Sequence, residues 1–252
     1  MKKSTFLLPL FLAFEVFAQT NQAVKETNFN VALSHNEIND DYMGNWRYTS
    51  LSSGVNFPLY DYLGANVFIS GSKSGELKYN HSNDSDTTQF EGYGSSAMLF
   101  LRDADIGKIG VTGGYSKTKT TTDIYNGMTT HTFKNTTTSR SYSLYGSYYL
   151  DDFTLNVSRR YLDLDNGHTL HYVDAGIGYY LNENTAFDVT VSGMDSSNKF
   201  RLHLAHQPSL LNNSTIVGIS YEKNDYDNAF TLFLSYHFQT KVSLRIRDRE
   251  YR

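Results

Sequence analysis

Apolar and polar residues alternate along most of this chain, from residue 27 to residue 238. In segments of roughly ten residues every second position is apolar, as in Leu63, Ala65, Val67 and Ile69. Successive side chains of a β-strand point to opposite faces, so each segment predicts a strand with one apolar face. Turn-forming Gly, Asp and Asn separate the segments. The pattern predicts about 12 strands, at 27–36, 47–57, 63–72, 89–101, 107–121, 138–150, 153–163, 170–181, 185–194, 199–207, 215–223 and 229–238.

Strands of this length with one apolar face are typical of barrels that cross a membrane. A closed barrel hydrogen-bonds all of its backbone groups within the sheet, which the interior of a bilayer requires. We therefore expect an all-β fold, an antiparallel transmembrane β-barrel of about 12 strands that occupies residues 19–238 as one domain. A soluble secreted β-sandwich or solenoid shares the alternation and is the alternative.

The connections between the predicted strands differ in length. Those at 58–62, 102–106, 151–152, 182–184 and 208–214 are short, whereas 73–88 and 122–137 are long and rich in Ser, Thr, Asn and Asp. Outer-membrane barrels have short periplasmic turns and longer external loops. The lengths therefore predict that both ends of the barrel are periplasmic and that the two long segments are solvated surface loops.

The first residues have the pattern of a secretion signal. Lys2 and Lys3 precede an apolar run, which ends in Val16-Phe17-Ala18 with the residue sizes that signal peptidase requires. We expect a cleaved signal peptide over residues 1–18 and a mature chain that begins at Gln19.

The last predicted strand resembles a known class of protein. Leu232, Leu234, Tyr236 and Phe238 share one apolar side that ends in aromatic residues. This strand resembles the C-terminal assembly signal of Gram-negative outer-membrane β-barrels of the porin-like kind, and the resemblance covers Thr27 to Phe238. It implies a location in the cell outer membrane of a Gram-negative bacterium. The partners that it implies are outer-membrane lipids, lipopolysaccharide and the barrel-assembly machinery.

Composition agrees with a barrel. Mean hydropathy is only −0.46, which a barrel tolerates because every second residue of its strands faces away from lipid. The 20 Tyr and 16 Phe suit aromatic girdles. The absence of Cys excludes disulfides and Cys-ligated metals. The net charge is −4 without a long basic stripe, so no nucleic acid is expected as a partner; no cofactor is expected either.

One hairpin predicts a pair of charges inside the barrel. The segment 164–168 fits a three-residue turn with Gly167 in the left-handed conformation. In that register Arg160 is a diagonal neighbour of Asp174, and both lie on the face opposite Val157 and Ile177. Two interpretations remain open, a structural ion pair and a pair that polarises a conducting lumen.

Two groups of residues are candidates for chemistry. His203, His206 and Ser209 are close enough in sequence for a nucleophile and its base, but they fall at a periplasmic turn without a hydrolase motif. His168 and His171 lie near Asp163 and Asp165 and suggest a weak cation site, although exposed loop residues are the simpler interpretation. No catalytic or metal-binding residue is therefore assigned.

Residues 239–252 extend beyond the last strand as a basic tail with a net charge of +3. Val242, Leu244 and Ile246 alternate, which suits a strand or a segment lying along a surface. We expect a solvated periplasmic tail, with contact to anionic material, lipid phosphates or a periplasmic partner as the alternative.

Three functions suit this barrel. The first is a porin-like channel for small solutes, because the inward faces carry Asn, Ser, Thr, Gly and Tyr. The second is a surface interaction barrel, either adhesin-like or similar to an autotransporter barrel without a passenger. A lipid hydrolase of the outer membrane ranks last, so the chain is not expected to be an enzyme.

Overall fold

The computed structural model describes residues 27–40, 44–81, 84–125, 129–165, 167–194, 197–225, 227–238 and 242–251. Nearly all of them lie in the strands of one antiparallel sheet. No helix among these residues is long and apolar enough to cross a membrane. The strands are β1 (Asn28–Asp40), β2 (Gly44–Tyr60), β3 (Leu63–Ser74), β4 (Leu77–His81), β5 (Asp84–Asp103), β6 (Gly107–Tyr125), β7 (Thr130–Leu150), β8 (Phe153–Leu164), β9 (Thr169–Asn182), β10 (Thr185–Met194), β11 (Ser197–His206), β12 (Thr215–Lys223) and β13 (Asp227–His237).

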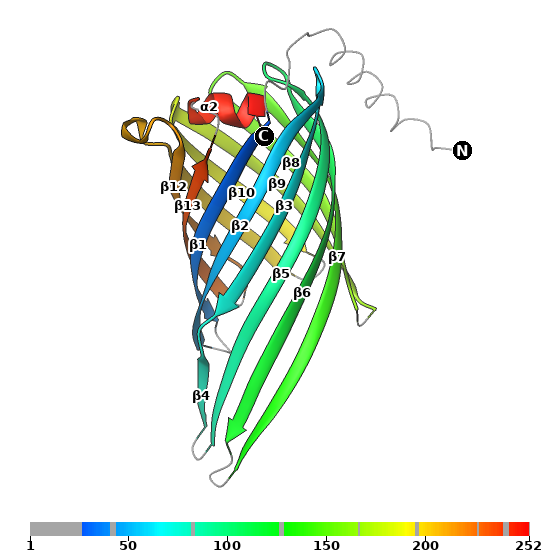
Figure 1. Cartoon of the computed structure of the whole chain (residues 1–252), viewed down its shortest axis with the longest axis vertical. Helices are drawn as coiled ribbons and strands as arrows, with labels where there is room; N and C mark the ends of the chain where they lie inside the picture. The colour runs from blue at the N-terminus through cyan, green and yellow to red at the C-terminus, as the bar shows by residue number, and fades with distance from the viewer. Residues whose placement is uncertain are drawn as a thin grey trace, which may run out of the picture.

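The sheet closes into a barrel (Figure 1). β1 pairs with β13, and β3 pairs with β5, while β4 continues β3 along the same neighbour. The ring therefore has twelve positions, which confirms the predicted all-β barrel of about 12 strands. Because each strand is paired on both sides around the ring, the barrel has no open edge within its wall.

The two long connections are not the loops that the sequence pattern predicts. β3 runs to Ser74 and β5 starts at Asp84, with β4 between them, and β6 and β7 continue to Tyr125 and from Thr130. The register of β5 with β6 runs without a break from Ser85↔Tyr125 to Asp103↔Gly107. These strands project past the rest of the wall at the end away from the C-terminal helix (Figure 1). Threonine is favoured in strands. The threonine-rich parts of β6 and β7 pair with each other beyond the barrel wall and therefore form strands there.

The hairpin between β8 and β9 has the predicted turn. Leu164 N–H donates to His168 O at 2.9 Å, Gly167 N–H donates to Leu164 O at 3.0 Å, and Gly167 has φ +83°. A residue with a side chain is strained at this φ, which accounts for the glycine. The turn fixes the register that pairs Ser158 with Asp174.

The short connections lie at the end of the barrel opposite the projecting hairpins. They include a 3-10 turn, η1 (Ser209–Leu211), and the C-terminal segment lies beside them as the short helix α2 (Leu244–Ile246) and the π-helical turn η2 (Arg247–Tyr251). Strand-rich barrels of this type carry short turns on the periplasmic side, so we refer to this end as the periplasmic mouth. The predicted signal peptide, residues 1–18, lies outside the described residues.

Candidate functional site in the barrel lumen

The two faces of the wall differ in polarity. Every second residue points outward, and the outward positions carry aliphatic and aromatic side chains that are largely exposed. On β13 and at the residue that follows it, for example, Leu232, Leu234, Tyr236 and Phe238 are 46–57% exposed, whereas Ser235 and His237 between them are buried. Apolar side chains on the outside of a closed barrel require a lipid environment. The molecule is therefore a membrane-spanning barrel with a polar interior.

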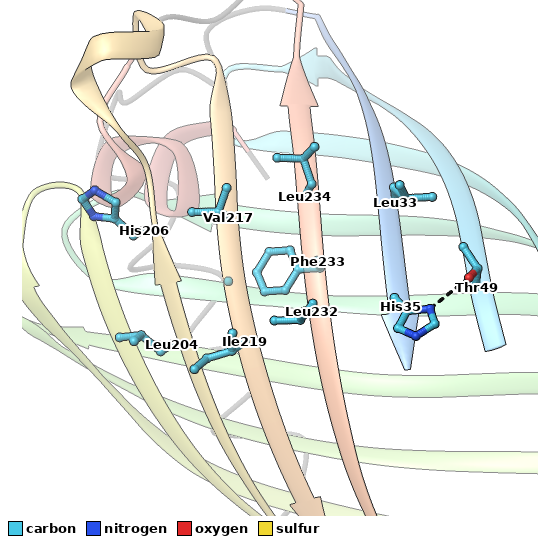
Figure 2. A pocket seen from close by; sticks show the side chains of 11 residues that line it. Leu33, His35, Thr49, Leu204, His206, Val217, Ile219, Leu232, Phe233 and Leu234 are labelled. Carbon is cyan, nitrogen blue, oxygen red and sulfur yellow. Dashed lines mark hydrogen bonds between the residues drawn. The ribbon is translucent and has the colours of Figure 1, made fainter. Parts of the chain in front are cut away.

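A hollow in this outer face belongs to the lipid-facing surface (Figure 2). It lies across β11, β12, β13, β1 and β2, between Leu204, Ile219, Leu232 and Leu33. His35 is at its side, with its Nδ1 atom 3.1 Å from Thr49 Oγ1. Because most of the side chains that line it are apolar, the hollow suits lipid tails and not a polar solute.

The lumen carries clustered charges on one side. Arg160 Nη2 on β8 lies 3.8 Å from Asp174 Oδ2 on β9, in the register that the sequence predicts. The Asp174 carboxylate also accepts hydrogen bonds from Ser158 Oγ at 2.6 Å and from Ser192 Oγ. The two neighbouring strands thus supply three groups to the same carboxylate, two from β8 and one from β10, which fixes its position against the wall.

A second ion cluster continues this row on the next two strands. Arg201 on β11 donates from Nε and Nη2 to Glu222 Oε2 on β12, at 2.9 and 2.7 Å, and Lys199 pairs with the other oxygen of Glu222. Sequence analysis missed this cluster. The signal that could have found it is that Arg201 and Glu222 fall on the polar face of their strands, as Arg160 and Asp174 do.

Aromatic and amide side chains line the other side of the lumen. The Trp46 ring stacks on Tyr48 with centroids 5.5 Å apart, and its distance to the Phe90 ring is 5.6 Å. Asn66 Nδ2 donates to Asn56 Oδ1 at 2.8 Å, and Asn56 Nδ2 donates to Asn28 Oδ1 at 3.1 Å. These groups make a wall that is polar but uncharged, opposite the two ion clusters.

The C-terminal segment, residues 242–251, folds against the inside of the periplasmic mouth. Leu244 is 0% exposed and packs with Tyr180, Ala186, Ala205 and Ile216, which all point into the barrel. The expectation of a solvated tail is therefore wrong for these residues. Their alternation suggested a strand or a segment lying along a surface, and the structure shows the second, with helical turns that pack on the inner wall. The physical reason is that the wall offers an apolar pocket at this level, which a residue such as Leu244 fills.

Polar contacts hold the C-terminal segment to the periplasmic turns. Gln207 Nε2 donates to Val242 O at 2.5 Å and to Asn213 O at 2.6 Å. Arg245 Nη1 lies 2.7 Å from Asp152 Oδ1, and its backbone N–H donates to Glu183 O at 3.0 Å. Three different turns thus supply partners, so the segment is fixed at several points around the rim.

The later residues of the segment reach into the lumen. Arg247 is 1% exposed and donates from Nη2 to Asn213 O at 2.8 Å. The Arg249 guanidinium lies over the Tyr149 ring, 4.8 Å from its centroid, and Tyr180 donates from its hydroxyl to Asp248 Oδ2 at 2.9 Å. The basic residues of the tail therefore contact aromatic rings and carbonyl groups of the barrel.

The segment lies across the mouth. α2 contacts β10, and η2 contacts β5, two strands that are five positions apart in the ring of twelve and so nearly opposite one another. Figure 1 shows the helix at this end, against the inner side of the strands. A cavity of about 250 Å³ remains between Asp248 and the wall residues Lys108, Tyr149, Asp188 and Tyr180. The lumen and the segment that covers its mouth form the candidate functional site.

The residues considered for catalysis or metal binding are not brought together. His206 points outward, with Nδ1 2.9 Å from Thr185 Oγ1, whereas His203 points inward and stacks on Phe233 at 5.1 Å. His171 makes an edge contact with the Tyr161 ring. Within the described part of the chain, no group of three His, Cys, Asp or Glu residues is arranged to hold a metal ion.

The fold is similar to that of several solved structures. The translocator domain of the autotransporter NalP from Neisseria meningitidis superimposes with a TM-score of 0.68 at 10% identity, covering 94% of this chain and 96% of that one. The fold is that of the outer-membrane β-barrels. An outer membrane channel from Pseudomonas putida F1 gives 0.60 at 8% identity, with 86% and 98% covered, and the KdgM porin in complex with oligogalacturonate gives 0.53 at 8%, with 82% and 99% covered. No protein-family model and no curated protein sequence matches the chain.

Proposed function

We propose that this protein is an outer-membrane channel for small solutes, with a C-terminal segment that covers its periplasmic mouth. The observation that carries the proposal is the row of inward charges on β8 to β12, from Arg160 to Glu222. Charges are costly in a dry packed interior. A water-filled lumen solvates them and lets them act on passing ions.

The fold comparisons support this proposal without deciding it. Two of the similar structures are named as a porin and a channel, and a barrel with about 12 strands suits a narrow pore. The similarity to a translocator domain is one of fold and does not favour that function over a channel. We expect no enzymatic activity, because His203 and His206 point to opposite sides of the wall.

Conductance in planar bilayers tests the proposal. The full chain and a variant that ends at residue 241 would be purified and refolded, with heat-modifiable mobility on gels as the check for a closed barrel. We expect the truncated barrel to conduct several-fold more than the full chain, because residues 242–251 lie across the mouth. If both barrels are folded and neither conducts, the channel function is overturned.

A surface interaction role is the second candidate, and it rests on the projecting strands. Over residues 130–137, β7 pairs with β6 along one edge. Its other edge pairs with β8 only from Ser139 onward, so along residues 130–137 this edge has no described strand partner. Such an edge can pair with another extended chain. If the protein acts only in this way, shortening the β6–β7 hairpin should abolish its binding to the partner, and neither the full nor the truncated barrel should conduct.

A further inference from the structure

Three basic residues on the outer face of β6, β7 and β8 have no acidic partner in the described structure. They are Lys117, Arg140 and Arg159, which point outward, and none of them forms an ion pair with a described residue. On the other side of the barrel, two outward basic residues have acidic partners, whereas Lys223 on β12 forms no ion pair with a described residue. Arg47 lies 2.7 Å from Glu37, and Lys73 lies 3.1 Å from Glu91. Outward cations without an acidic partner therefore gather on β6, β7 and β8.

The three residues lie at the external border of the apolar band. On β6 the outward residues Ile109, Val111 and Tyr115 precede Lys117, and on β7 the residues from Leu150 to Tyr142 precede Arg140. Lys117 and Arg140 each lie roughly ten residues from the periplasmic end of their strand. At about 3.3 Å per residue and about 40° of tilt this corresponds to a rise of about 25 Å, the height of the apolar band of an outer-membrane barrel. Both cations thus reach the headgroup level of the outer leaflet.

The backbone of Arg159 lies deeper in the apolar band, and its side chain extends toward the headgroup level. It follows Phe153, Leu155 and Val157 on β8, and its guanidinium lies 5.0 Å from the ring centroid of Tyr161, which is the next outward residue toward the external end. A long basic side chain near the border of a bilayer reaches toward the headgroups in this way.

Tyrosines surround the three cations. Tyr115 is paired with Arg140 across β6 and β7, and Tyr142 is paired with Tyr161 across β7 and β8. Tyr115 and Tyr142 are 42% and 51% exposed. Their rings suit the interface between acyl chains and headgroups, and their hydroxyls can bond to phosphate or sugar oxygens. We call Lys117, Arg140, Arg159, Tyr115, Tyr142 and Tyr161 the basic patch.

The carboxylates near the basic patch do not neutralise it. Asp163 is paired with Arg140 in the register but lies beyond ion-pair distance of it, and it accepts a hydrogen bond from Thr169 Oγ1 at 2.8 Å. Asp165 accepts from Thr138 N–H at 2.7 Å. Asp165 lies on the external side of Arg140 and Asp163 lies beside Arg140, so the side of Arg140 toward the apolar band remains cationic.

We propose that the basic patch binds a phosphorylated glycolipid of the outer leaflet, of the lipopolysaccharide class. The phosphates contact Lys117, Arg140 and Arg159, and the acyl chains lie along Val111, Leu144 and Val157 directly below. The charge of the basic patch and its position above the apolar wall favour a lipid phosphate over a free anion. This inference rests on the outer-membrane location proposed above but not on conductance.

Native mass spectrometry of the detergent-solubilised barrel with bisphosphorylated lipid A tests the inference. The test variant carries Lys117→Gln, Arg140→Gln and Arg159→Gln. The matched control carries Arg47→Gln, Lys73→Gln and Lys223→Gln, three outward basic residues on other strands. We expect the parent and the control to retain lipid A, the test variant to bind it at least ten-fold more weakly, and none of them to retain phosphate-free lipid A.

The outcomes that overturn the inference are equally specific. They are a parent that retains no bisphosphorylated lipid A, a test variant that retains as much as the parent, and equal retention of the phosphate-free form. Heat-modifiable mobility checks folding, and if the triple variant does not fold, Arg140→Gln alone carries the same comparison. Conductance of the same samples in bilayers without lipid A separates the two proposals. If the parent binds lipid A, and neither the parent nor the chain that ends at residue 241 conducts, the channel is overturned and the lipid site is left intact.

Discussion

The hydroxyl of Tyr180 on β9 donates a hydrogen bond to Asp248 Oδ2, 2.9 Å away and 68 residues later in the chain. The bond connects the inner wall of the barrel to the segment that lies across its periplasmic mouth. In the same place the Arg249 guanidinium is 5.7 Å from the Tyr180 ring centroid. One aromatic side chain of the wall therefore contacts both an acid and a base of the C-terminal segment.

Removing this bond should loosen the segment without unfolding the barrel. Tyr180→Phe keeps the ring and deletes one hydrogen bond to a charged group, which contributes about 1.5–3 kcal/mol. If the segment limits conduction, we expect conductance of Tyr180→Phe to exceed that of the parent at least several-fold. Tyr179→Phe is the control, since Tyr179 points outward against Phe153. Equal conductance of Tyr180→Phe and Tyr179→Phe would mean that this bond does not hold a closed state.

Leu244 and Ile246 give a second matched pair. Leu244 is 0% exposed in the apolar cluster, whereas Ile246 on the same helix is 38% exposed. Leu244→Asp would place a carboxylate in that cluster and should displace the segment, because an unpaired buried charge costs several kcal/mol. We expect Leu244→Asp to reproduce the conductance of the chain that ends at residue 241, and Ile246→Asp to behave as the parent. Limited proteolysis within residues 242–251 provides an independent measurement, with faster cleavage expected only for Leu244→Asp.

The strands within the wall were predictable from sequence because one face of each strand contacts lipid and the other faces the polar lumen, so apolar and polar residues alternate. Where strands leave the wall, that contrast ends. At 122–125 and 130–137 both faces meet water, so Thr122 and its neighbours show no alternation and predict a loop, although β6 and β7 include these residues. The missing information was the pairing between the two strands, which a single segment does not carry.

The C-terminal segment was not predictable for a different reason. The pocket for Leu244 is made by Tyr180, Ala186 and Ile216 from three strands, and no local pattern shows that their side chains meet. The pair Arg160 and Asp174 was predictable because one tight turn fixes the register between two adjacent strands. Prediction from sequence thus succeeded where one tight turn fixes the register of two strands in the wall, and it failed for contacts that close the end of the barrel.

The last strand should guide assembly through its aromatic end. Tyr236 and Phe238 point outward at the periplasmic border, with rings in edge contact at 4.9 Å, and β13 pairs with β1 to close the barrel. We expect Phe238→Ala and Tyr236→Asp to lower the amount of heat-modifiable barrel in the outer membrane at least several-fold. Phe230→Ala, at the external end of the same strand, is the control. Unchanged yields of both variants would show that these rings do not act as an assembly signal.

Arg160 and Asp174 test whether the inward charges lie on the path of ions. The distance of 3.8 Å between Arg160 Nη2 and Asp174 Oδ2 brings opposite charges together, so that deletion of either one leaves the other to set the local field. We expect Arg160→Ala to shift selectivity toward cations and Asp174→Ala to shift it toward anions. Both barrels should fold. Without Asp174, the remaining Arg160 side chain is 53% accessible to water, and without Arg160, the remaining Asp174 carboxylate keeps its hydrogen bonds from Ser158 and Ser192. Reversal potentials in a salt gradient measure the shift, best in the background that ends at residue 241, where the mouth is uncovered. Conduction with the same selectivity in the parent and both variants would place this pair outside the ion path, and a conducting parent would still support the channel itself.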